Sequence, residues 1–159
     1  MKKCKICVYA IAKNESKFVQ RFYDSVKEAD EICVLDTGSE DDTVKLLRKL
    51  GVNVYEEKII PWRFDVARNR SLDLVSDDID ICVCLDLDEV LLPGWREEIE
   101  KAWEPNVTKI IYNYNWLLDK DDKPLVNFYY EKIHSRHDYK WVHPVHEVLT
   151  YVGEGDEIK

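Results

Sequence analysis

The order of short strand-forming runs and amphipathic segments constrains the fold of this chain most strongly. Four such runs are present: Ile6–Ala12, Ile32–Leu35, Val52–Tyr55 and Ile79–Leu85. The segments between them are of helical character, with apolar residues spaced so that they share one helix face. Strands that alternate with helices are typical of right-handed crossovers and of a mainly parallel sheet covered on both faces. The sequence therefore predicts a doubly wound α/β fold.

The helices carry signals at their ends. Apolar residues recur at helical spacing between residues 18 and 26, which predicts a helix after the first strand. Ser39, followed three positions later by Asp42, resembles a capping box that begins a second helix, and Gly51 is expected at its C′ position. Further helices are predicted over Val66–Val75 and near Trp95–Trp103.

The second half of the chain differs in composition. Lys109–Leu118 and Leu125–Ile133 are rich in Tyr, Ile and Val, and a polar turn at 119–122 joins them. This pattern predicts a β-hairpin added to the sheet. Tyr139–Val152 is aromatic, and Gly153–Lys159 is expected to fray. A length of 159 residues predicts a single domain.

Charge excludes one class of partner. The chain has 32 acidic and 23 basic residues, a net charge of −9 before histidine is counted. Such a surface repels polyanions, which argues against nucleic acid as a partner. The basic start and the short apolar run after it lack the cleavage pattern of a signal peptide, and no apolar segment is long enough for a transmembrane segment. We therefore expect a cytoplasmic protein.

The five cysteines are Cys4, Cys7, Cys33, Cys82 and Cys84. The C-x-x-C spacing of the first two would suit zinc or redox chemistry, but no second pair follows and the other three lie in apolar runs. We interpret the cysteines as small buried side chains of a protein in a reducing compartment.

Polar clusters follow three of the predicted strands, at 14–15, 36–39 and 86–89. Ligands of open α/β sheets bind beyond the carboxyl ends of parallel strands, so these clusters are expected to converge on one rim. If strand geometry continues past Leu85, Asp86 and Asp88 point the same way. Two such carboxylates favour a hard cation, Mg²⁺ or Mn²⁺, over the alternative of a solvated acidic turn.

Residue type alone leaves the other candidates open. Asp36 and Gly38 suit either close approach to a ligand or a turn with a helix cap. Arg68 suits the diphosphate or the base of a nucleotide, because a guanidinium binds phosphate bidentately and stacks on rings; a surface helix arginine is the alternative. Three histidines are interpreted as solvent-facing or packed on aromatic rings: His134, His137 and His143. Spacing alone does not make His146 a ligand.

Six motifs in order resemble a family 2-type glycosyltransferase of the GT-A fold: ICVYAIAKNES, EICVLDTGSEDDT, GVNVYE, FDVARNRSL, CVCLDLDE and WVHPVHEVL. The resemblance extends from about Ile6 to Leu149. It implies a hexosyltransferase that uses a nucleotide-diphosphate sugar, with a UDP-sugar expected, and Mn²⁺ or Mg²⁺ as cofactor. The acceptor, a glycan, a lipid or a protein, and the oligomeric state are not indicated.

The resemblance also implies roles for individual residues. The turn that includes Ile11, Ala12 and Glu15 would hold the base and ribose together with Asp36, and Arg68 would contact the nucleotide. Asp86 and Asp88 match the D-x-D of the family, with Asp88 the expected metal ligand and Asp86 nearer the ribose or a metal-bound water. His146 matches the histidine of the late V-H-E pattern and would complete the metal shell.

Inversion at the anomeric carbon requires in-line attack, and the acceptor hydroxyl then needs a general base opposite the leaving diphosphate. Glu147 is the candidate; Glu131, Asp119 and Glu89 stay open. The resemblance divides the chain into a nucleotide-binding part over about 1–92 and a part over about 93–152 that completes the acceptor and metal site. The chain is short for this family, which leaves acceptor recognition open.

Two other functions are compatible with parts of the sequence. The D-x-D-x-V-L pattern over 86–91 fits a phosphatase like the haloacid dehalogenase group, with Asp86 as covalent nucleophile. That chemistry needs further parallel strands, whereas the roughly 70 residues after Asp88 resemble a hairpin. The second alternative is a non-catalytic module that binds a nucleotide-sugar.

Overall fold

The computed structural model describes residues 4–159, and its first half alternates strands and helices in the predicted order. The elements are β1 (Ile6–Ala12), the 3₁₀ turn η1 (Ser16–Phe18), α1 (Val19–Val26), β2 (Glu31–Asp36), α2 (Thr43–Lys49), β3 (Asn53–Glu56), α3 (Phe64–Asp73), β4 (Ile81–Cys84) and α4 (Trp95–Ala102). The second half contributes β5 (Lys109–Leu118), β6 (Pro124–Ser135), β7 (Tyr139–Val142) and β8 (Val148–Tyr151).

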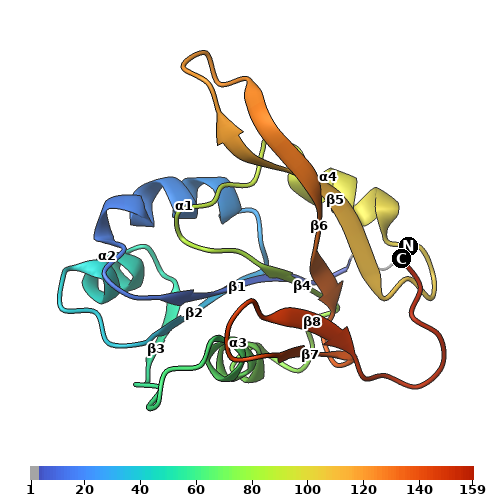
Figure 1. Ribbon diagram of the computed structural model, residues 1–159, viewed down its shortest axis with the longest axis horizontal. Coiled ribbons are helices and arrows are strands. Elements are labelled where there is room, and N and C mark those ends of the chain that lie inside the picture. Colours follow the sequence, from blue (N-terminus) through green and yellow to red (C-terminus); the bar gives the residue numbers. More distant parts are fainter. Residues whose placement is uncertain (1–3) are drawn as a thin grey trace.

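Six of these strands form one sheet in the order β3-β2-β1-β4-β6-β5 (Figure 1). The first four are parallel, and β6 pairs antiparallel with β4, with Val83 opposite Ile133. β5 returns antiparallel to β6, and β7 and β8 form a separate two-stranded sheet. The predicted doubly wound sheet with an added hairpin is confirmed.

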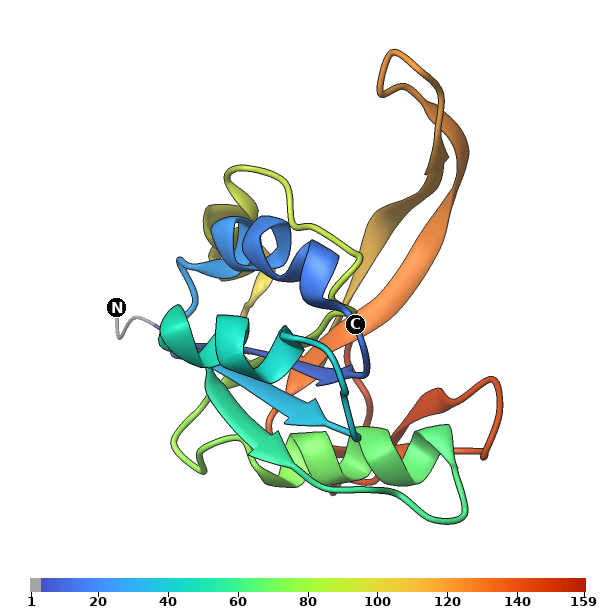
Figure 2. The same cartoon turned by 90° about the vertical axis from the view of Figure 1, so that its left-hand side faces the viewer.

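The central strands are buried on both faces, because helices cover the sheet from both sides (Figure 2). Side chains alternate along β1, so Ile6 and Val8 pack toward α1, α2 and α4, whereas Cys7 and Tyr9 pack toward α3, β7 and β8. The second face also holds the buried cysteines Cys33, Cys82 and Cys84. With Cys7 they are fully buried core residues, as predicted, whereas Cys4 is only partly buried. No disulfide joins cysteines among residues 4–159.

The predicted capping box at Ser39 is wrong. Helix α2 begins at Thr43, and the Ser39 hydroxyl donates to Asp36 instead (2.5 Å). Asp41 accepts the backbone N–H of Thr43 at 3.0 Å and so satisfies a donor of the first helical turn. Gly51 follows the helix with φ 85° and donates to the Arg48 carbonyl, as expected for a C′ glycine.

The chain end at 153–159, expected to fray, is instead held against β5. Ile158 accepts the backbone N–H of Thr108 at 2.8 Å and of Lys109 at 3.2 Å. Lys159 forms ion pairs with Glu131 at 3.0 Å and with Glu157 at 3.5 Å. Backbone hydrogen bonds to Ile158 therefore hold this segment in place, although its composition is mostly polar.

The β5–β6 hairpin projects well beyond the rest of the sheet (Figures 1 and 2). Its register shifts between Asn115 and Leu117, which is a β-bulge in the projecting part. Over residues 4–159, the helices are all too short or too polar to cross a bilayer.

Candidate active site

The three polar clusters after β1, β2 and β4 meet at one rim of the sheet. The backbone N–H of Asn14 donates to the Ser39 hydroxyl at 2.8 Å, and Asn14 Oδ1 accepts the N–H of Glu40 at 2.8 Å. Two adjoining clefts open at this rim, a large cleft of about 410 Å³ and a small cleft of about 270 Å³. Arg68, Asp86 and Asp88 line both clefts and therefore mark their junction.

Arg68 is a buried residue of α3, not a surface helix arginine. Its side chain is 7% exposed, and Nη1 donates to Asp86 Oδ1 at 2.6 Å. Nε donates to Glu147 Oε1 at 3.1 Å. The guanidinium carbon lies 5.7 Å from the ring centroid of Trp141, within the range of a cation–π contact. One arginine thus joins the end of β4 to the turn between β7 and β8.

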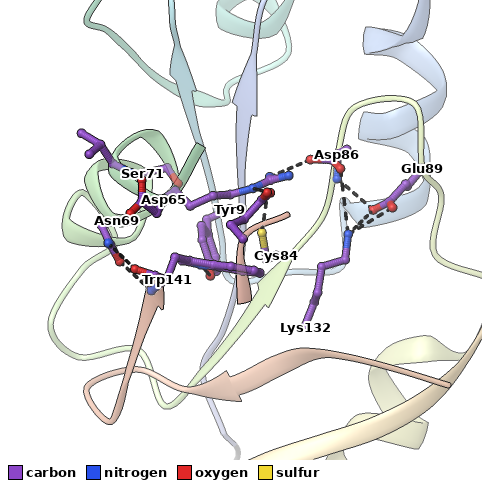
Figure 3. Close-up of polar contacts among 12 residues, drawn as sticks. Tyr9, Asp65, Asn69, Ser71, Cys84, Asp86, Glu89, Lys132 and Trp141 are labelled. Carbon is purple, nitrogen blue, oxygen red and sulfur yellow. Dashed lines mark hydrogen bonds and ion pairs between the residues drawn. The ribbon is translucent and has the colours of Figure 1, made fainter. Parts of the chain in front are cut away.

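Lys132 on β6 supplies a second buried cation. Its side chain is 6% exposed, and Nζ donates to both carboxylate oxygens of Glu89 at 3.1 Å (Figure 3). The Tyr114 hydroxyl also donates to Glu89, at 2.8 Å. Burial favours the neutral amine, but Glu89 and Asp86 outweigh burial and raise the pKa of Lys132 above its ordinary value. Lys132 is therefore an ammonium ion in the cleft.

Neighbouring charges shift the pKa values of Asp86 and Glu15 in opposite directions. Burial would raise the pKa of Asp86, but Arg68 and Lys132 outweigh it and hold that pKa below its ordinary value. Burial and then the negative charges of Asp88 and Asp86 raise the pKa of Glu15. Three carboxylates therefore share the small cleft, a charge arrangement that a cation would relieve.

Asp88 is exposed and lines both clefts. Its loop is held from the other side of the rim, because Arg21 on α1 donates to the Asp88 carbonyl at 2.6 Å. The hydrogen bond from Arg21 thus holds the backbone of Asp88, while its carboxylate is exposed at the junction of the two clefts.

Seven of the nine site residues expected from the sequence line these clefts: Ile11, Ala12, Glu15, Arg68, Asp86, Asp88 and Glu147. Asp36 lies just beneath the rim and is 1% exposed. Its carboxylate accepts the backbone N–H groups of Gly38 at 2.9 Å and Ser39 at 2.8 Å, so it holds the turn whose Thr37 lines the small cleft.

His146 is not brought into the site with Asp88. It is exposed, has φ 56°, and is absent from the described residues that line either cleft. Its neighbour Glu147 turns inward and is 16% exposed, because Arg68 holds its carboxylate. The metal role expected for His146 stays a prediction.

Of the residues left open as the general base, Glu147 and Glu89 line the large cleft. Glu131 forms ion pairs with Lys109 at the start of β5 and with Lys159 at the chain end. Asp119 accepts backbone N–H groups in the turn between β5 and β6. Glu89 is bonded to Lys132 and Tyr114 and also accepts the N–H of Asp86 at 3.0 Å. The general-base role of Glu147 stays a prediction.

A buried hydrogen-bond chain supports the site from below. The Trp141 indole N–H donates to the Tyr9 hydroxyl at 2.9 Å, and Tyr9 lies 2.8 Å from His134 Nε2. His134 Nδ1 lies 2.8 Å from the Ser135 carbonyl, which only accepts, so Nδ1 donates and Nε2 accepts from Tyr9. His134 packs on Tyr9 and Tyr139, in agreement with the aromatic-packed interpretation.

The side chain of Asn69 fastens β7 to α3. Its amide donates to the Trp141 carbonyl and accepts the Trp141 N–H, both at 2.8 Å (Figure 3). This pair of bonds fixes the strand that places Trp141 against Arg68.

The donor set suits a metal ion that arrives with a phosphate ligand. Within the described chain no three His, Cys, Asp or Glu side chains are grouped so as to enclose a metal ion by themselves. Mg²⁺ and related ions are commonly held by one or two carboxylates, with substrate phosphates and water completing the shell. Asp88, exposed at the junction beside Asp86, fits such a site.

Sequence reasoning missed the residues that the second half of the chain contributes. Lys132 and Trp141 line the large cleft together with four aromatic residues of the hairpin. The period-two alternation of Phe128, Tyr130 and Lys132 places them on one face of a strand, and this was the available signal. Trp62, which lines the small cleft, lies in an irregular segment, and Phe64, which also lines it, is the first residue of α3; neither stands in an alternating strand pattern.

The model of the family described as glycosyl transferase family 2 matches residues 7–146. The chain belongs to this family. The match includes β2 through β7, all of β1 except Ile6, and every residue that lines the two clefts except Glu147.

Curated relatives of this family 2 chain are named uncharacterized glycosyltransferases. One from Rickettsia conorii is 38% identical over 97 residues, which cover 60% of this chain and 33% of that protein. One from Rickettsia prowazekii is 35% identical over 97 residues, covering 60% of this chain and 32% of that protein. The chain spans about a third of the length of these relatives.

Solved structures show the same fold. Glucosyl-3-phosphoglycerate synthase from Mycobacterium tuberculosis, in complex with Mn²⁺, UDP and glucosyl-3-phosphoglycerate, is 25% identical with a TM-score of 0.53, covering 67% of this chain and 42% of that one. A mannosyltransferase from Pyrobaculum calidifontis, in complex with GDP-Man and Mn²⁺, is 21% identical with a TM-score of 0.56, covering 69% and 35%. Both are glycosyltransferases, and the predicted GT-A fold is confirmed.

Proposed function

We propose that the chain is the core of a metal-dependent hexosyltransferase that moves a sugar from a UDP-sugar to a hydroxyl acceptor with inversion. Membership of glycosyl transferase family 2 supports the reaction class. The observation that carries the proposal is the junction of the two clefts, where Arg68, Asp86 and Asp88 serve both. A donor bound in one cleft would present its anomeric carbon to an acceptor bound in the other.

The small cleft is the proposed nucleoside site. Ile11, Ala12 and Glu15 line it at the end of β1, and Trp62 and Phe64 close it with rings 5.1 Å apart. UDP is favoured as the nucleotide because the M. tuberculosis synthase, at 25% identity, was crystallised with UDP and Mn²⁺. Asp36 would contribute by holding the turn at Thr37 in place.

The large cleft carries more negative than positive charge before any donor binds. Asp86, Asp88, Glu89 and Glu147 line it, against Arg68 and Lys132. A diphosphate would be repelled unless a divalent cation, Mn²⁺ or Mg²⁺, bound with it. Asp88 would hold that ion, with His146 the further candidate, and the ion would stabilise the charge of the leaving diphosphate.

Glu147 is the proposed general base. Its carboxylate lies in the large cleft, and the hydrogen bond from Arg68 Nε at 3.1 Å fixes one oxygen. The other carboxylate oxygen would take the proton of the acceptor hydroxyl. Arg68 would thereby orient the base and hold Asp86 with the same guanidinium.

We further propose that residues 1–159 form one domain in which the part over about 1–92 binds the donor and the part over about 93–152 completes the site. The large cleft, lined by residues of α3, of the loop after β4, and of β5, β6 and β7, supports this division. The four buried cysteines without disulfides fit a reducing, cytoplasmic location. The net charge of −9 supports the expectation that nucleic acid is not a partner.

The test is titration calorimetry of UDP-glucose, UDP-N-acetylglucosamine and GDP-mannose, each with and without Mn²⁺. We expect one donor to bind, and far more tightly with the metal than without it. Asp88→Asn should abolish this binding, whereas Asp73→Asn, an exposed carboxylate on α3, should leave it unchanged. Donor binding that is equally tight without the metal, or a metal effect that survives Asp88→Asn, would remove the proposed site.

A non-catalytic nucleotide-sugar module is the second candidate, because the ion pair with Arg68 engages the proposed base. Slow hydrolysis of the bound donor distinguishes the two, since transferases commonly hydrolyse a donor when no acceptor is present. Hydrolysis lost in Glu147→Gln supports the enzyme; donor binding with no hydrolysis supports the module. The phosphatase alternative loses its structural basis, because the strand that follows β4 in the sheet, on the side away from β1, is the antiparallel β6 and not a further parallel strand.

A further inference from the structure

The two faces of the β5–β6 hairpin differ sharply in composition. On one face Tyr112 lies opposite Tyr130 and Tyr114 lies opposite Phe128, and Trp116 continues this row. Neighbouring ring centroids are 5.3 to 6.4 Å apart, the spacing of aromatic rings in contact. We call the outer part of this row, formed by Tyr114, Trp116, Phe128 and Tyr130, the aromatic platform.

Along the middle of the hairpin, the opposite face carries three asparagines and one exposed ring. Asn113 lies opposite Tyr129, and Asn115 lies opposite Asn127. Stability of the hairpin alone does not require exposed aromatic rings to be gathered on one face. Trp116 is 70% exposed and Phe128 is 37% exposed, so little protein in the described chain covers the platform.

The aromatic platform is continuous with the proposed catalytic site. All four of its residues line the large cleft, together with Asp86, Asp88 and Glu147. The innermost one, Tyr114, donates to Glu89 within the charged cluster, whereas Trp116 lies farther out along the projecting hairpin. A ligand that fills the large cleft therefore contacts both the carboxylates and the rings.

We propose that the aromatic platform binds sugar rings of the acceptor, so that the acceptor is a carbohydrate of at least two sugar units. This inference rests on the proposed function. A pyranose offers a flat C–H face that packs on an aromatic ring, while its hydroxyl groups bond to polar neighbours such as the Tyr114 and Tyr130 hydroxyls. A terminal sugar at the carboxylates would leave the next unit over Trp116 and Phe128.

Charge argues against a membrane as the occupant of this face. The turn at the hairpin end, 119–123, carries three aspartates and two lysines. A surface that inserts at an anionic bilayer usually carries clustered basic residues, which this turn lacks. Rings with hydroxyl groups, next to charged side chains, match the mixed polar and apolar surface of a sugar better than that of an acyl chain.

The test uses an array of defined bacterial and mammalian glycans, probed with the whole chain in the presence of UDP and Mn²⁺. Glycans that bind are then titrated by calorimetry against four proteins: wild type, Trp116→Leu, Trp116→Phe and Tyr129→Leu. Tyr129 is the matched control, an aromatic residue 74% exposed on the opposite face of the same hairpin. Leucine keeps an apolar side chain, whereas phenylalanine keeps a ring.

We expect wild type to bind a disaccharide or larger glycan more tightly than the matching monosaccharide. Affinity should fall about tenfold in Trp116→Leu and less than about threefold in Trp116→Phe, with no change in Tyr129→Leu. A protein that binds UDP with Mn²⁺ but no glycan would overturn this inference and leave the proposed function standing. Failure to bind any nucleotide would instead count against the proposed function.

Two further outcomes would also overturn the inference. Equal loss in Trp116→Leu and Tyr129→Leu would show a general effect on the hairpin. Vesicle binding or self-association that depends on Trp116, measured with phosphatidylglycerol vesicles and by analytical ultracentrifugation, without glycan binding, would assign the platform to a membrane or to a second copy of the chain.

Discussion

At Arg68 one buried cation satisfies two carboxylates, Asp86 and Glu147. Removing a partner from a buried ion pair leaves charge without compensation and is strongly destabilising. We expect Arg68→Ala to lower the free energy of unfolding by about 3 kcal/mol, measured by urea denaturation without ligands.

Arg70 provides the matched control on the same helix. It pairs with Glu57 at 2.8 Å, but both side chains are 42% exposed. Exposed pairs contribute less than about 1 kcal/mol, so Arg70→Ala should change stability little. Equal costs for the two variants would mean that burial of the Arg68 cluster has no energetic consequence.

His134 makes stability depend on pH. Burial lowers the pKa of His134 to about 4, whereas an unfolded chain has a histidine pKa of about 6.5. Between these values the unfolded state binds more protons, so this contribution to stability is complete above pH 6.5 and is lost as pH falls toward 4. Its size is about 3 kcal/mol.

The measurement is urea unfolding at several pH values between about 4.5 and 7.5, in wild type and two variants. His134→Gln should flatten the rise of stability with pH in this window. His137→Gln should leave the rise unchanged, because His137 is exposed. An unaltered slope in His134→Gln would show that other groups cause the pH dependence.

At the scale of elements, the position of the β7–β8 hairpin depends on Asn69. Its amide supplies both hydrogen bonds to the Trp141 backbone. Asn69→Ala would leave a partly buried N–H and C=O unpaired, at a cost of about 2 kcal/mol. We expect faster hydrogen exchange at Trp141 and across β7 and β8, measured by mass spectrometry, with α1 unchanged as the internal reference.

Asn69→Asp gives an intermediate test. Aspartate keeps an acceptor for the Trp141 N–H but loses the donor to its carbonyl, so exchange should increase less than in Asn69→Ala. If both variants exchange like wild type, β7 is held by the packing of Trp141 and Tyr139 and not by the amide.

The same elements show what the sequence could predict. Short apolar runs predicted β1, β2 and β4, and two runs rich in Tyr, Ile and Val joined by a polar turn predicted the β5–β6 hairpin. It could not place Lys132 beside Glu89, because that contact depends on β6 pairing with β4 across about 50 residues of chain. The Ser39 capping box was wrong because the Asp36 carboxylate, brought close by the end of β2, competes for its hydroxyl.

The roles expected for Asp36 and His146 come from the family resemblance and stay predictions. Both stand at positions that the family motifs assign to ligands, but motifs do not report side-chain direction. Asp36 turns toward the backbone of its own turn, and His146 points to solvent beside an inward Glu147. Direction depends on local backbone geometry, such as the φ of 56° at His146, which sequence patterns do not encode.

At the scale of the whole molecule, a net charge of −9 and an acidic cleft have one consequence for binding. Without a divalent metal, UDP approaches a cleft of like charge, and salt screens this repulsion. We therefore expect the affinity for UDP in EDTA to rise about two- to threefold between about 50 and 300 mM NaCl. With Mn²⁺ the approaching ligand is a metal complex of lower charge, so the salt dependence should vanish or reverse.

Both titrations are followed by the quenching of tryptophan fluorescence, because Trp62 lines the small cleft. Affinity that falls with salt in EDTA would mean that Arg68 and Lys132 dominate the field at the phosphates and that the metal is not needed to offset the charge of the protein.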